Sequence, residues 1–205
     1  MIDLPMLLAF VGAASILALT PGVDTAIVLN TAVTSGKRPA LMAAFGIGLG
    51  CFAWGAAVSV GLGSMLQASE TAYNVVKYLG ALYLLLLGLW LLAQPRSSST
   101  ADMPAQSHYG SWQAFTRGLI VNLLNPKVGI FYLTFLPQFI PQDKPVALYA
   151  LLLASIHVLL SMIWFGALIV ATVPLGRFLR RPTTIRVLDR LTGGIFVIFA
   201  ARLAS

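Results

Sequence analysis

Long apolar segments constrain this chain more than any other feature of its sequence. They fall at about 4–33, 40–66, 77–93, 115–140, 146–174 and 187–203. Each is long enough to cross a hydrocarbon layer of about 30 Å as a helix, with some tilt. They lack the alternating polarity of a transmembrane β-strand. We therefore predict an all-α integral membrane protein with six transmembrane helices.

The composition supports this prediction. Only 9% of the residues are charged, against about 25% in a soluble domain. The mean hydropathy is +0.89. The net charge of +7 does not indicate a nucleic-acid partner, since no basic run alternates with aromatic residues. The single cysteine, Cys51, excludes an internal disulfide and any metal site built on paired cysteines.

The distribution of basic residues predicts the orientation. Nine of the 13 Lys and Arg residues fall on the side that the chain reaches after the first, third and fifth segments. Three fall on the other side, and Lys127 lies within a segment. Because cytoplasmic loops carry an excess of Lys and Arg, we place the nine in the cytoplasm and both termini outside.

The two halves of the chain show a weak internal repeat. At a shift of 105 positions, residues 10–29 align with residues 115–134, and Thr20-Pro21 meets Asn125-Pro126. Each half has three segments, and an odd number places the copies in opposite orientations. We expect one transmembrane domain, residues 1–205, with inverted repeats at about 1–93 and 115–205 and a linker at about 94–114.

Two helix-start signals lie inside the first and fourth segments. Thr20 and Asn125 are good N-cap residues, and Pro21 and Pro126 suit the first helical position. Gly22 adds conformational freedom at the first signal. We therefore predict that both helices are broken near mid-membrane. The freed backbone groups must be buried in protein or line a watery cavity, so the breaks could build a polar site.

Two charged residues flank these breaks. Asp24 follows the first, Lys127 follows the second, and Asp24 is the only acid well inside a predicted segment. A charge at a helix centre costs about 2.5–3.5 kcal/mol on insertion scales, which calls for a partner: the other charge, a substrate or a proton. Across a cavity, Asp24 could hold an α-ammonium and Lys127 an α-carboxylate. The alternative is a purely structural pair in two kinked helices.

Other polar residues are weaker candidates. Asn122 and Asn125 flank the second break and could bind substrate, although capping alone explains Asn125. His157 could relay protons or be a hydrogen-bonded core histidine. No Ser/His/Asp grouping suggests a hydrolase, and two histidines are too few for a metal centre. We predict no enzyme activity, no metal and no cofactor.

Four stretches carry a family resemblance. They are TPGVDT (20–25), SGKRPA (35–40), KYLGALYLLLLG (77–88) and FTRGLIVNLLNPKVGIFYLTFLPQF (115–139). In this order they resemble the lysine exporter family (LysE/RhtB type), which exports amino acids across the inner membrane. Val23 departs from the proline usual in the homoserine/threonine branch, and Ala40 departs from a usual glycine.

The resemblance implies a multi-pass inner-membrane exporter of amino acids or close derivatives, working by proton antiport. The residues that the resemblance supports as site residues are Pro21, Gly22, Asp24, Asn125, Pro126 and Lys127. It also supports Gly36 with Arg38 as a cytoplasmic turn. The single acid at the break favours a neutral amino acid, such as homoserine or threonine, over a dibasic one. With the reasoning above, the candidate substrate-binding residues are Thr20, Pro21, Gly22, Asp24, Asn122, Asn125, Pro126 and Lys127. The candidate proton-coupling residues are Asp24 and His157.

The predicted partners are an amino acid, protons and the lipid bilayer, and a homodimer is left open. Access to the site would alternate as the two repeats rock against each other. Two other functions are kept as alternatives. One is a divalent cation exporter, although a divalent cation site requires several oxygen ligands. The other is a membrane scaffold without cargo, which leaves the paired breaks unexplained.

Overall fold

The computed structural model describes residues 4–68, 70–95, 108–141, 144–172 and 181–204. Across these ranges every regular element is a helix, which confirms the predicted all-α class. The α-helices are α1 (Leu4–Leu19), α2 (Val23–Thr34), α3 (Lys37–Ala68), α4 (Glu70–Ala93), α5 (Ser111–Leu123), α6 (Pro126–Ile130), α7 (Val146–Val170) and α9 (Pro182–Ala204). A π-helical turn (Phe131–Phe135) and a 3₁₀ turn (Leu136–Phe139) continue α6.

Both predicted helix breaks are present. α1 and α2 meet at 51°, and α5 meets the helix over Pro126–Phe139 at 53°. The second break follows the predicted signal, since Asn125 is the N-cap, Pro126 begins α6, and the Asn125 side chain accepts a hydrogen bond from the Lys127 amide at 3.1 Å. Local sequence chemistry thus accounts for this break.

The first break differs from its prediction in detail. Gly22, not Thr20, is the N-cap of α2, and it makes no side-chain capping bond. The Thr20 hydroxyl instead donates back to the carbonyl of Ile16 at 2.6 Å, at the end of α1. Pro21 therefore lies before the cap rather than at the first helical position. The Ile16 carbonyl also accepts the Thr20 amide at 3.0 Å, so both groups of Thr20 close the end of α1 rather than cap the start of α2.

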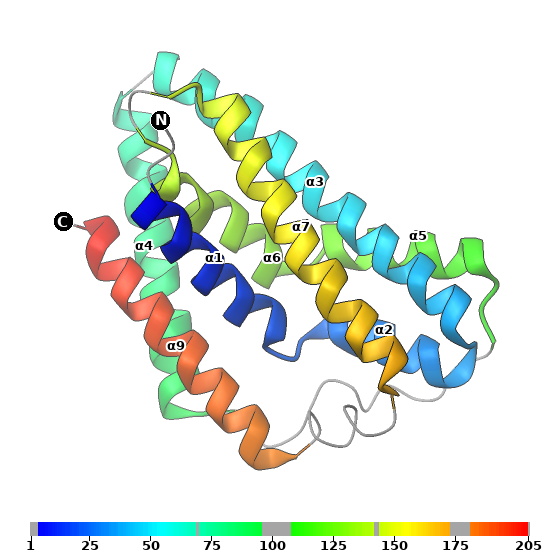
Figure 1. The fold of residues 1–205 in the computed structure, drawn as a ribbon. Coiled ribbons are helices and arrows are strands. Elements are labelled where there is room, and N and C mark those ends of the chain that lie inside the picture. The colour runs from blue at the N-terminus through cyan, green and yellow to red at the C-terminus, as the bar shows by residue number, and fades with distance from the viewer. Residues whose placement is uncertain (1–3, 69, 96–107, 142–143, 173–180, 205) are drawn as a thin grey trace.

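The helices run alternately between two ends of the molecule (Figure 1). α3 over Lys37–Gly61 and all of α7 are long and apolar enough to cross a membrane, as is each bent pair when it is counted as one span. The α4 segment Tyr78–Ala93 is a shorter apolar helix. The element order matches the six predicted segments. That α4 and α9 also cross, and that the halves are inverted repeats, stays a prediction.

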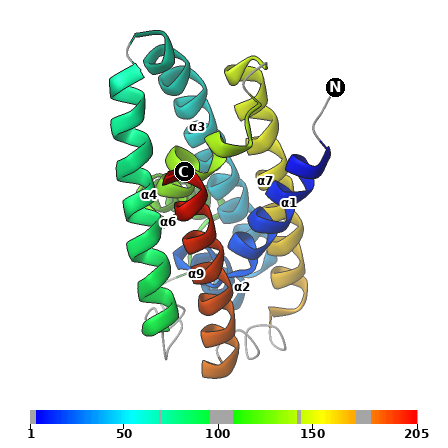
Figure 2. The ribbon, with the colours of Figure 1, turned by 90° about the vertical axis from the view of Figure 1, so that its left-hand side faces the viewer.

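Close helix crossings hold the bundle together. α3 packs along α5 and α7. α4 packs along α9 (Figure 2). A Cβ atom on Gly46 of α3 would collide with the α5 backbone, and one on Gly118 of α5 would collide with the α3 backbone. The absence of a side chain at Gly46 and Gly118 thus lets α3 and α5 approach each other closely. Gly88 and Gly193 make a similar contact between α4 and α9.

Candidate functional site

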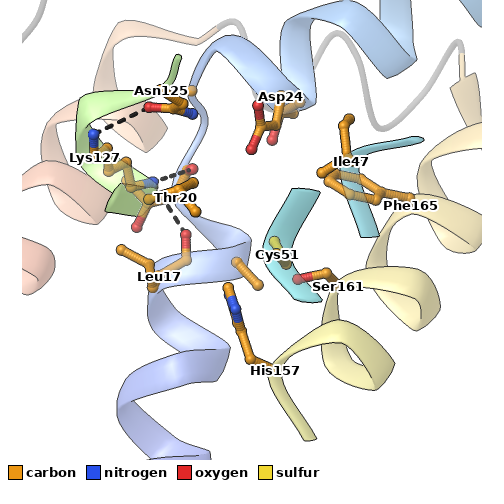
Figure 3. A pocket seen from close by; sticks show the side chains of 14 residues that line it. Leu17, Thr20, Asp24, Ile47, Cys51, Asn125, Lys127, His157, Ser161 and Phe165 are labelled. Atoms are coloured by element: carbon orange, nitrogen blue, oxygen red, sulfur yellow. Dashed lines mark hydrogen bonds between the residues drawn. The ribbon is translucent and has the colours of Figure 1, made fainter. Parts of the chain in front are cut away.

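The two helix breaks lie beside each other around one cavity of about 40 Å³. Thr20, Gly22 and Asp24 line it from the first break, and Asn125 and Lys127 line it from the second. α7 adds His157 and Ser161, and α3 adds Cys51 (Figure 3). The structure therefore brings together residues that are about 100 positions apart in the chain.

Asp24 is held in place by the other half of the chain. It lies in the first turn of α2, where the positive end of the helix dipole favours a carboxylate. Its Oδ2 accepts a hydrogen bond from Nδ2 of Asn122 on α5 at 2.9 Å. Asn122 is fully buried. Among the residues that the structure describes, Oδ1 of Asp24 is buried without a hydrogen-bond partner, so the carboxylate keeps accepting capacity toward the cavity.

Lys127 mirrors this arrangement from the second break. Its Nζ donates to the carbonyls of Leu17 and Thr20, each at 3.1 Å (Figure 3). Leu17 lies in the last turn of α1 and Thr20 directly follows the helix, where helix bonding ends and partial negative charge gathers. Each charge is thus held by neutral groups of the opposite break, and both face the same cavity. In Figure 3 the α1–α2 connection runs between Asp24 and Lys127.

His157 enters the cavity from α7 and is almost fully buried. Its Nδ1 lies 3.0 Å from the hydroxyl of Tyr132, which belongs to the π-helical turn after the second break. Nδ2 of Asn122 also lies 3.5 Å from the sulfur of Cys51, which lines the cavity from α3. The sequence analysis did not single out Tyr132, because an aromatic residue in an apolar run carries no positional signal.

Three predicted substrate-binding residues, Asn122, Pro126 and Pro21, do not line the first cavity. Asn122 lies behind Asp24 and supports it, rather than lining the cavity. Pro126 lines a second cavity, described below. Pro21 is buried within the connection between α1 and α2.

One buried acid was missed. Asp189 was not among the candidates, because it is the third residue of the predicted segment at 187–203, yet on α9 it is completely buried. In the sequence Asp189 lies between two basic residues, Arg186 and Arg190. The fold turns it inward, beside Thr192, whose hydroxyl lies 2.6 Å from that of Thr20. Asp189 lines the second cavity together with Lys127.

Broken membrane helices whose ends meet around a polar cavity are typical of secondary transporters. The LysE type translocator family matches residues 15–205, and the chain belongs to this family. It is 33% identical to the leucine efflux protein of Enterobacter sp. (strain 638), over 96% of this chain and 93% of the relative.

Two other relatives cover similar lengths. The chain is 28% identical to the uncharacterized membrane protein YrhP of Bacillus subtilis (strain 168), over 96% of this chain and 97% of the relative. It is 27% identical to the homoserine/homoserine lactone efflux protein of Salmonella typhimurium, over 96% of this chain and 95% of the relative. No solved structure matches the chain.

Proposed function

We propose that this protein exports neutral amino acids or close derivatives from the cytoplasm across the inner membrane. Two relatives carry names that state efflux of leucine and of homoserine or its lactone, which supports export and this class of substrate. The observation that carries the proposal is the cavity between the two breaks, where Asp24 and Lys127 present opposite charges.

The charges suit the constant part of an amino acid. Asp24 binds the α-ammonium through the oxygen that no described residue occupies. Lys127 binds the α-carboxylate by turning its ammonium away from the α1 carbonyls. A zwitterion satisfies both groups at once, whereas a simple cation would leave Lys127 facing a like charge.

Proton coupling follows from the same carboxylate. When the site is empty, a proton on Asp24 removes the cost of a charge in the membrane. An arriving ammonium displaces that proton, so the two ligands alternate on one group. His157 lines the same cavity and, with Tyr132, forms a buried polar pair through which the proton can be exchanged.

The volume of the cavity implies movement. A volume of about 40 Å³ has room for only a few water molecules. An amino acid is larger, so the walls must separate for it to enter. Rocking of one half of the chain against the other would open the breaks to each side in turn.

The test is efflux of labelled amino acids from loaded proteoliposomes with an imposed pH gradient. We expect D24N and K127Q to abolish efflux and the matched charge variant K37Q, at an exposed position, to retain it. Normal efflux by D24N and K127Q would reject the site. A wild-type protein that moves divalent cations instead, or moves nothing, would favour one of the two alternative functions.

A further inference from the structure

A second cavity lies between α4 and α9. It shares Thr20 and Lys127, two residues of the breaks, with the first cavity. α4 and α9 stand side by side with α6 behind them (Figure 2). The volume of this cavity is about 210 Å³. An engineered apolar cavity of about 150 Å³ accepts benzene. The second cavity can therefore hold a molecule of amino-acid size, whereas the cavity of about 40 Å³ beside Asp24 cannot in this conformation.

One end of this cavity is polar and charged. Thr20, Lys127, Asp189 and Thr192 line it there. The carboxylate of Asp189 is completely buried, and the hydroxyls of Thr20 and Thr192 lie 2.6 Å apart. Lys127 and Thr20 line both cavities. Lys127 therefore has one acid in each cavity, Asp24 in the first and Asp189 in the second.

The rest of the second cavity is apolar. α4 contributes Tyr83, Leu87, Trp90 and Leu91, and α9 contributes Phe196. Phe196 and Leu91 are buried, while Trp90 is 48% exposed and forms an outer wall. Aromatic and aliphatic walls around a few convergent polar groups are typical of small-molecule sites.

We propose that this cavity binds an amino acid with a large aliphatic or aromatic side chain. Asp189 holds the ammonium, Lys127 holds the carboxylate, and the α4–α9 walls enclose the side chain. The inference rests on the proposed function and deepens it, since it states where the side chain is selected. The carboxylate stays on Lys127 while the ammonium passes from Asp189 to Asp24 as the first cavity opens.

The test is equilibrium binding of radiolabelled leucine and alanine to the purified full-length protein in detergent. We expect the wild type to bind leucine at least about tenfold more tightly than alanine, because each additional methylene group gains contact with the apolar walls. L87F fills the apolar part, so leucine binding weakens about tenfold or more while alanine binding is kept. The matched variant L86F, at a neighbouring position that is 58% exposed, leaves both affinities unchanged.

D189N tests the charged end, and it is expected to weaken the binding of both amino acids. Retained alanine binding shows that L87F is folded, and a single elution peak with an unchanged melting temperature shows this for D189N. Unchanged leucine affinity in L87F, unchanged binding in D189N, or a wild type that binds neither amino acid or prefers alanine would each overturn the inference.

The binding and efflux measurements distinguish failure of the export proposal from failure of the α4–α9 site. If leucine binds with the expected variant pattern but proteoliposomes show no efflux, the export proposal fails and the α4–α9 site stands. If proteoliposomes export leucine while L87F and D189N export it at the wild-type rate, the α4–α9 site fails and export stands.

Discussion

Lys127 links the two halves of the chain through one ammonium group. It follows the second break, yet its hydrogen bonds go to the end of α1 in the first half. Asn122 makes the reverse link, from α5 to Asp24 on α2. Each break is therefore completed by a residue of the other. The two charged side chains should act as a unit, and substitutions at the two positions should not be additive.

The role of Asn122 can be tested by removing its amide. In N122A, Asp24 loses its donor, and leaving a buried carboxylate oxygen unsatisfied costs about 1–3 kcal/mol. We expect a higher KM for amino acid efflux and a lower melting temperature. N74A, at a half-buried position away from the breaks, serves as the matched control. Efflux by N122A that equals efflux by N74A would show that Asn122 does not position Asp24.

At the scale of elements, the crossing of α3 and α5 places the second break in space, although local chemistry fixes its position in the chain. α5 ends just before Asn125, and at Gly46 and Gly118 the backbones of α3 and α5 leave no room for a Cβ atom. A larger distance between α3 and α5 would therefore displace Asn122 and the second break. Asn122 itself lies against Gly50, one turn further along α3, where a Cβ atom would collide with its side-chain oxygen. Small residues on α3 thus set the position of the site.

The substitution G46A tests this crossing. Its new methyl group meets backbone atoms of α5, which cannot turn aside as a side chain can. We expect about 1–3 kcal/mol of destabilisation, typical of overpacking, seen as a lower melting temperature of the purified protein. In the control G48A, the nearest atoms are side-chain tips of Met162 and Val158 at 3.4 Å, so little change is expected. Equal melting of the two variants would contradict the proposed role of Gly46.

The whole molecule has two distinct ends. The start of α1 and the end of α9 lie toward one end, and the α2–α3 turn lies at the other (Figure 1). That turn meets the start of α5, since the amide of Tyr109 donates to the hydroxyl oxygen of Ser35 at 2.9 Å. Gly36, with φ of +91°, makes the turn in a conformation that favours glycine. Lys37 and Arg38 follow it and predict that this end faces the cytoplasm.

Cysteine labelling checks this orientation. Cys51 is the only cysteine and is buried, so C51S gives a background without reactive thiols. In that background, P145C at the start of α7 should react with a membrane-impermeant thiol reagent in intact cells. G110C at the start of α5 should react only after the membrane is permeabilised. Both positions are exposed in the fold. The opposite pattern would invert the predicted topology.

The sequence by itself determined the helices and their breaks, because both depend on local chemistry. Apolar length fixes which segments become helices, since a backbone in lipid must satisfy its own hydrogen bonds. Asn125 and Pro126 start a helix through contacts within a few residues, and this break appears where it was predicted. Asp24 and Lys127 were recognisable for a similar reason, as charges in apolar runs stand out without knowledge of the fold.

Only the tertiary structure decided which groups meet. Asn122 reaches Asp24 across 98 positions, and Lys127 reaches Thr20 across 107. No local pattern encodes such pairs, because they depend on how each helix is rotated and on how closely neighbours pack. Asp189 shows this most clearly, because nothing in its local sequence marks it as a site residue, yet the fold buries it completely.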